Sequence, residues 1–132
     1  MMTRRMYLLM LPLLLPTLAG ATTPLQQAMQ RARALRDAAV RAGDQPYGAV
    51  VLRGAQIVGE APSRVVTAGD PTAHAEMEAI RDAARKLRSR DLSDCVLVST
   101  SRPCRMCESA AAWARMSRMV HGDALTDAGP PS

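Results

Sequence analysis

A histidine and a glutamate, His74 and Glu76, stand two residues apart in a stretch that is typical of a helix start. Asp70 is a suitable N-cap, and Pro71 suits the first helical position because its missing N–H needs no partner there. Residues 72–88 contain no Gly or Pro, and their apolar positions recur every three or four residues, which predicts a helix. The sequence therefore places an imidazole and a carboxylate in the first turn, at the positive end of the helix dipole.

Two cysteines, Cys104 and Cys107, follow Pro103, which opens a second predicted helix. Residues three apart lie on one face of a helix, so both thiolates can face one point. Together with His74 they offer three metal ligands and leave a fourth position open, which is typical of a catalytic zinc rather than a structural one. Glu76 would bring a carboxylate close to the same point. The spacing predicts a zinc hydrolase site.

The first 21 residues are expected to be an export signal rather than part of the fold. A basic start at Arg4-Arg5 precedes an apolar run, and Ala19-Gly20-Ala21 supplies a small-residue cleavage pattern. Two prolines interrupt the run, which is shorter than the roughly 17 apolar residues that a membrane-spanning helix needs. We therefore expect an exported, periplasmic protein with a signal of the Sec or twin-arginine type, and one mature domain over residues 22–132.

The composition favours a small-molecule enzyme over a protein that binds nucleic acid or a membrane. Without residues 1–21 the net charge falls from +5 to +3, because two arginines leave with the signal. Tyr47 and Trp113 are then the only aromatic residues, so stacking platforms for single-stranded nucleic acid are scarce. Three cysteines do not make a disulfide framework, and Cys95 begins an apolar run in which we expect it to be buried.

The remaining pattern predicts an α/β domain with three α/β/α layers. A capping box at Thr23 begins a helix that ends at Gly43. The order helix, hairpin, helix, strand, helix, strand predicts a four-stranded sheet between helices, with the two ligand-bearing helices side by side on one face. Residues from Thr126 onward are expected to be a polar tail. The expected strands are residues 47–52, 56–59, 95–100 and 119–121.

Residues 45 to 122 resemble the cytidine deaminase superfamily, in the branch of guanine deaminases and tRNA adenosine deaminases. The stretch from Asp70 to Glu76 matches the most distinctive block of that branch residue for residue, and Pro103 to Cys107 resembles its second block. Trp113-Ala114-Arg115 is similar to a motif of guanine deaminases. The resemblance implies the cytidine deaminase-like fold. Because the chain ends soon after the fourth strand, we expect the usual C-terminal strand and helix to be lacking.

The resemblance also implies a zinc-dependent hydrolytic deaminase. Zinc would be held by the three ligands named above, with Glu76 moving the proton. Such an enzyme converts an exocyclic amine of a nucleobase or nucleoside to a carbonyl and releases ammonia, and a guanine-type purine is the favoured substrate here. The expected substrate contacts are Tyr47, Ser63, Ala75 and Trp113. Ser63 stands where the family usually has an asparagine that contacts the base.

Three alternatives stay open at this stage. The chain could be a tRNA adenosine deaminase-like enzyme, because tRNA and guanine deaminases share the blocks quoted above. It could be a zinc-binding protein that keeps the fold without the activity. It could also be an exported dithiol redox protein, since Cys-x-x-Cys at a helix N-terminus stabilises a thiolate. We expect a small-molecule partner, no nucleic acid, no membrane association after signal removal, and a homodimer.

Overall fold

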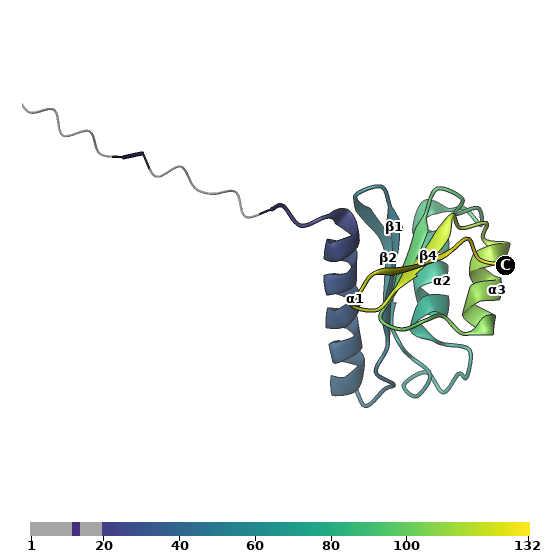
Figure 1. The fold of residues 1–132 in the computed structure, drawn as a ribbon. Coiled ribbons are helices and arrows are strands. Elements are labelled where there is room, and N and C mark those ends of the chain that lie inside the picture. The colour runs from purple at the N-terminus through teal and green to yellow at the C-terminus, as the bar shows by residue number, and fades with distance from the viewer. Residues whose placement is uncertain (1–11, 14–19) are drawn as a thin grey trace, which may run out of the picture.

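A mixed sheet with helices on both faces organises the computed structural model, which describes residues 12–13 and 20–132 (Figure 1). The signal predicted over residues 1–21 falls mostly on residues outside this set. Among the residues described, no helix is long and apolar enough to cross a membrane. In chain order the elements are α1 (Pro24–Arg41), β1 (Gly48–Arg53), β2 (Gln56–Pro62), α2 (Ala75–Leu87), β3 (Val96–Ser99), α3 (Arg105–Trp113), β4 (Arg118–His121) and β5 (Thr126–Gly129).

The sheet has the strand order β2-β1-β3-β4-β5. Strand β1 is antiparallel to both β2 and β3, β3 is parallel to β4, and β4 is antiparallel to β5. The parallel pair is joined through α3, as a crossover between parallel strands requires. This central part of the sheet confirms the predicted α/β class and places α2 and α3 next to each other.

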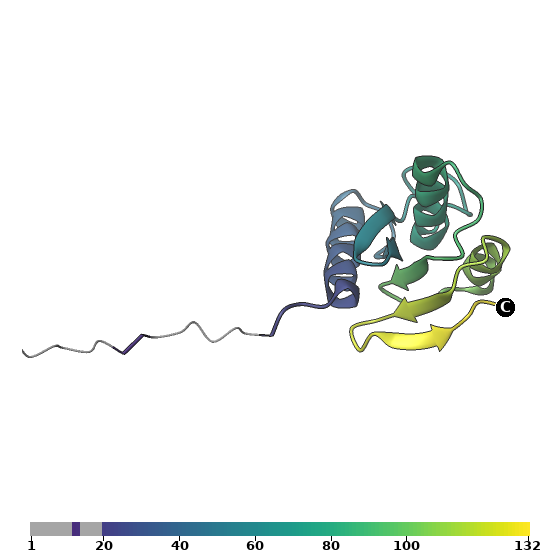
Figure 2. The same cartoon turned by 90° about the horizontal axis from the view of Figure 1, so that it is seen from above.

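Helix α1 covers one face of the sheet, as Figure 2 shows from above. The predicted capping box is confirmed: Thr23 Oγ1 accepts a hydrogen bond from the Gln26 backbone N–H at 3.1 Å, and the Thr23 N–H donates to Gln26 Oε1 at 2.9 Å. The apolar side of the helix packs on the sheet through Met29 and Leu35, which share a cluster with Val50. This layer lies opposite the predicted metal ligands.

Helices α2 and α3 cover the other face and are in contact with each other, as predicted. Small residues allow α2 to approach the sheet closely. A Cβ added to Gly59 would lie 2.6 Å from the carbonyl oxygen of Ala79 and 2.6 Å from the Cβ of Ala83, so only glycine fits there. Ala111 of α3 joins the same buried cluster. The close packing fixes the N-termini of both helices relative to the sheet.

The prediction of a four-stranded sheet with a polar tail is wrong by one strand. Residues Thr126–Gly129 form β5, which pairs with β4 after a turn in which Gly122 and Leu125 adopt positive φ angles of 73° and 51°. The first three residues of β5 are exposed and none is a large apolar residue. The strand therefore forms through backbone hydrogen bonds at the sheet edge, without the alternation of apolar and polar residues on which strand prediction depends.

Candidate metal centre

The two ligand-bearing helices begin later than the sequence predicts, and this places two of the three ligand residues at helix caps. His74 is the N-cap of α2 and Cys104 is the N-cap of α3. Asp70 does not cap α2: its Oδ1 accepts hydrogen bonds from the N–H and the hydroxyl of Thr72, both at 2.8 Å, and so closes a separate turn. The turn delays the helix by one turn and leaves the His74 side chain facing α3.

The three predicted ligands converge. The Nδ1 atom of His74 lies 3.7 Å from the Sγ atom of Cys104 and 3.7 Å from that of Cys107, and all three atoms lie within 4.8 Å of one another. Zinc bonds of about 2.3 Å to sulfur and 2.0–2.1 Å to nitrogen in a tetrahedral site give sulfur–nitrogen separations of roughly 3.6 Å. The spacing therefore fits a zinc ion held on three sides, with its fourth position free.

The chemistry of the donor set also fits a cation. Cys107 is fully buried, and burial raises the pKa of its thiol, which the charge of Glu76 raises further. Burial likewise raises the pKa of Glu76, whose side chain is 4% exposed. A bound divalent ion favours the charged forms instead, since a thiol that coordinates a metal loses its proton outright. The Cys107 thiol and the Glu76 carboxylate are thus gathered where the protein alone disfavours their charged forms.

A cavity of about 400 Å³ opens beside the metal ligands. Its lining includes His74, Glu76 and Cys104, so two of the three ligand residues and the carboxylate border the same space. The volume lies within the range of about 300–1,000 Å³ that is usual for small-molecule sites. Three ligands, a nearby buried carboxylate and an adjoining cavity form the arrangement of a catalytic rather than a structural metal site.

The family follows from comparison with known proteins. The family model of the cytidine and deoxycytidylate deaminase zinc-binding region matches residues 22–123. The chain belongs to this deaminase family. Its His/Cys/Cys group is positioned to bind a metal, as expected of this zinc-binding family, and the match does not support the alternative of a dithiol redox protein.

Two kinds of deaminase are among the relatives. The chain is 41% identical to guanine deaminase of Bacillus subtilis over 101 residues, covering 76% of this chain and 65% of that protein. It is 39% identical to tRNA-specific adenosine deaminase of Aquifex aeolicus over 89 residues, covering 66% of this chain and 59% of that protein. The chain thus spans less than two thirds of the length of either relative.

The solved structures agree with the family. The X-ray structure of the Bacillus subtilis guanine deaminase superposes with a TM-score of 0.70 at 39% identity, covering 74% of this chain and 62% of that one. Guanine deaminase from Nitrosomonas europaea gives a TM-score of 0.70 at 29% identity, and the match covers 76% of this chain and 59% of that one. These likenesses confirm the predicted cytidine deaminase-like fold.

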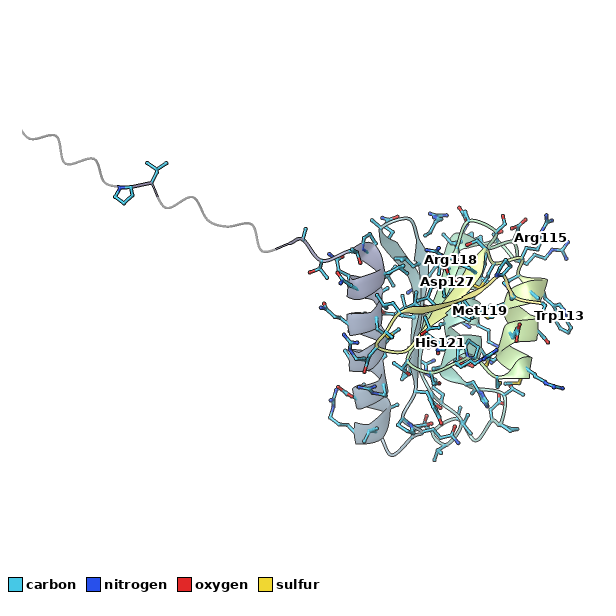
Figure 3. All side chains as sticks on the ribbon, viewed as in Figure 1. Trp113, Arg115, Arg118, Met119, His121 and Asp127 are labelled. Atoms are coloured by element: carbon cyan, nitrogen blue, oxygen red, sulfur yellow. The ribbon has the colours of Figure 1, made fainter. Side chains whose placement is uncertain are left out.

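The structure brings only some of the predicted substrate contacts to the cavity. Tyr47 and Ala75 line it. Ser63 does not line it: its hydroxyl is buried and donates to Asp44 Oδ1 at 2.9 Å. Trp113 does not line it either, because it is the last residue of α3 and projects outward with 86% of its surface exposed (Figure 3).

Sequence reasoning missed three polar residues of the cavity wall, namely Gln45, Ser101 and Arg102. Each lies within three residues of a predicted site residue, Tyr47 or Cys104, so proximity in the chain was the available signal.

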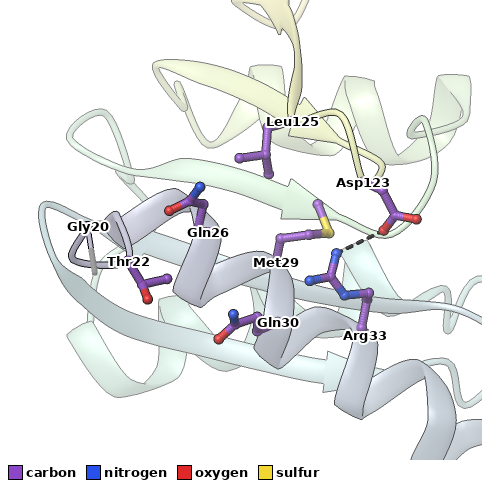
Figure 4. A pocket seen from close by; sticks show the side chains of 8 residues that line it. All are labelled: Gly20, Thr22, Gln26, Met29, Gln30, Arg33, Asp123 and Leu125. Atoms are coloured by element: carbon purple, nitrogen blue, oxygen red, sulfur yellow. Dashed lines mark hydrogen bonds and ion pairs between the residues drawn. The ribbon is translucent and has the colours of Figure 1, made fainter. Parts of the chain in front are cut away.

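Another cavity, of about 420 Å³, lies between α1 and the turn after β4. Its lining includes Gln30 and an ion pair of Arg33 with Asp123 at 2.8 Å (Figure 4). Its lining contains none of the metal ligands.

Proposed function

We propose that the protein is a hydrolytic deaminase acting on a small nucleobase or nucleoside, with a guanine-type purine favoured as the substrate. The observation that carries this proposal is the buried carboxylate of Glu76, which lines the same cavity as His74 and Cys104. Zinc bound by the three ligands would supply a Lewis acid that activates water at neutral pH. The guanine deaminase relatives support the purine preference.

Glu76 supplies the proton transfers of this reaction. It accepts one proton from the attacking water and passes it to the ring nitrogen, then takes the second proton from the hydroxyl so formed and delivers it to the departing amine, so that water and the aminated ring yield a carbonyl and ammonia. A group that must both accept and donate protons works best with a pKa near the working pH. Burial moves the pKa of Glu76 upward from its ordinary acidic value, which is the required direction.

A tRNA adenosine deaminase-like activity is the second candidate, because such enzymes are among the relatives. The charge distribution favours the small substrate. The whole sequence contains a single lysine, and a domain over residues 22–132 would carry a net charge of only +3. RNA binding depends strongly on neutralising phosphates with basic side chains. The cavity wall has one arginine, Arg102, among its described residues.

Ammonia release tests the proposal directly. Zinc-loaded protein is incubated with guanine, adenine, cytosine, their nucleosides, and a tRNA anticodon stem-loop carrying adenosine. We expect turnover of at least one free base or nucleoside, with guanine the best. Turnover of the stem-loop alone would favour the tRNA activity. Zinc binding without turnover of any of these compounds would instead favour a protein that has kept the fold and lost the activity.

We also propose that the protein is exported to the periplasm. The support is the sequence pattern of residues 1–21, with a basic start, an apolar run and a small-residue cleavage site. Expression in a Gram-negative host should then yield a periplasmic product whose N-terminus begins near Thr22, and deletion of residues 2–21 should keep the protein in the cytoplasm. Mass spectrometry of the fractionated protein checks both results, and an intact N-terminus in the cytoplasmic fraction would contradict the proposal.

A further inference from the structure

A buried carboxylate that the mechanism does not use lies just behind the cavity wall. Asp44 is 9% exposed and accepts four hydrogen bonds. Its Oδ1 accepts from the Gln45 N–H at 2.8 Å and from the Ser63 hydroxyl at 2.9 Å, and its Oδ2 accepts from the N–H groups of Val66 at 3.2 Å and Thr67 at 2.7 Å. None of the ion pairs among the described residues includes Asp44.

Asp44 keeps its charge through these bonds alone. Its burial raises the pKa of the carboxyl, but the hydrogen bonds from Thr67, Gln45 and Ser63 outweigh this and hold the pKa well below its usual range. Hydrogen bonds to a charged acceptor are about twice as strong as neutral ones. We call Asp44 and its four donors the Asp44 clasp. It ties the segment after α1 to the loop after β2.

The clasp fixes one wall of the cavity. Residues Gln45, Pro46 and Tyr47 line the cavity directly after Asp44 in the chain. Two backbone hydrogen bonds reinforce the clasp: the Ser63 N–H donates to the Tyr47 carbonyl at 3.0 Å, and the Tyr47 N–H donates to the Gln45 carbonyl at 2.8 Å. The backbone that carries Gln45 is therefore held from both sides, and Ser63 contributes to this support with its hydroxyl and its N–H.

Gln45 brings a distinctive group to this wall. Among the described residues that line the cavity it is the one carboxamide, and its side chain takes part in none of the hydrogen bonds found among the described residues. A carboxamide presents a donor and an acceptor side by side. Such a pair matches a heterocycle edge on which a donor and an acceptor are adjacent, as glutamine does when it binds adenine in DNA.

We propose that Gln45 is a specificity-determining residue, held by the Asp44 clasp so that its carboxamide binds a substrate edge with adjacent donor and acceptor atoms. This inference rests on the proposed function and adds the class of ring that the cavity selects. It assigns Asp44 and Ser63 the part of positioning residues, which act on substrate binding through Gln45. A site built around such a hydrogen-bonding pair rejects analogues that lack the matching edge, because its own polar groups are then left unpaired.

Gln45→Leu tests the proposal with guanine and 2-aminopurine, which carry the same amine but differ in the neighbouring carbonyl and ring N–H. We expect the KM for guanine to rise roughly tenfold with little change in kcat, and the preference for guanine over 2-aminopurine to shrink in proportion. Gln30→Leu is the matched control, since Gln30 is exposed on α1 and lines the other cavity. Unchanged KM and unchanged preference in Gln45→Leu would overturn the inference.

Ser63→Ala tests the clasp without removing the buried charge. It deletes one of the four hydrogen bonds to Asp44 and should raise the KM for guanine in the same direction as Gln45→Leu, with zinc content unchanged. The double variant should be no worse than Gln45→Leu alone, because both changes act through the same side chain. Additive losses would show that Ser63 acts independently of Gln45 and would overturn the positioning role.

Equilibrium dialysis of guanine against the zinc-loaded protein separates this inference from the proposed function. Weaker binding in Gln45→Leu than in the wild type, without turnover in either, would support the inference and overturn only the proposed activity. Turnover of guanine by the wild type, with equal binding in both proteins, would overturn only the inference. Absence of guanine binding to the wild type would overturn both.

Discussion

Glu76→Gln is expected to lower deaminase turnover by about 10²–10⁴-fold while the protein keeps its zinc and its fold. The amide has nearly the shape of the carboxylate but cannot accept a proton from water and return it to the substrate. Glu76 is 4% exposed, so the substitution also replaces a buried ionisable group with a neutral one and leaves no unpaired charge. The group positioned to bind a metal, His74, Cys104 and Cys107, is not altered.

Glu78→Gln is the matched control. Glu78 lies on the same helix, two residues further on, and pairs with Arg81 at 2.6 Å outside the cavity. Loss of this pair should change turnover little, because neither residue lines the cavity or belongs to the metal-binding group. Ammonia release and zinc content are measured for the wild type and both variants. Wild-type turnover in Glu76→Gln would remove Glu76 from the mechanism, and loss of its zinc would show that it is a ligand.

The metal centre could be predicted from sequence because its ligands are fixed by local structure. His74 and Cys104 both stand at helix N-caps, and Cys107 follows one helical turn after Cys104. Helices α2 and α3 precede and follow β3 in the chain and lie side by side on one face of the sheet, so the two motifs lie close together in the fold. The exact helix start was less predictable, since Asp70 can cap either a helix or the separate turn that it closes with Thr72.

The cavity wall could not be predicted in the same way, because it depends on contacts between distant segments. Ser63 does not line the cavity, and its hydroxyl donates to Asp44, which lies 19 residues earlier in the chain. Trp113 is placed by the length of α3: the helix ends at this residue, and the last turn carries it outward. Neither the partner of Ser63 nor the end of α3 follows from the residues beside them. Strand β5 was missed for a related reason, since its partner β4 supplies the pairing that its own residues do not signal.

Replacement of a single zinc ligand should have an equally large effect, on metal content rather than on proton transfer. The wild type is expected to hold about one zinc ion per chain. Cys107→Ser is expected to lose this zinc and, with it, the deaminase activity. Cys107 is fully buried, so its thiolate forms only with a cation beside it, and a serine hydroxyl in the same place is a poor zinc ligand. Elemental analysis of protein prepared under reducing conditions measures the zinc, and ammonia release measures the activity.

Cys95→Ala is the matched control for this variant. Cys95 is also fully buried, but it lies in the apolar cluster under α2 and α3, and its thiol is not part of the metal-binding group. Burial raises the pKa of Cys95 to about 11, which keeps the thiol neutral and inert. This variant should keep its zinc and lose only the stability that the smaller buried side chain no longer supplies.

Chelation should lower the Tm of the wild type and of Cys95→Ala, because zinc stabilises only the folded protein. The Tm of Cys107→Ser should not change on chelation. Zinc retained in Cys107→Ser but lost from Cys95→Ala would contradict the ligand assignment.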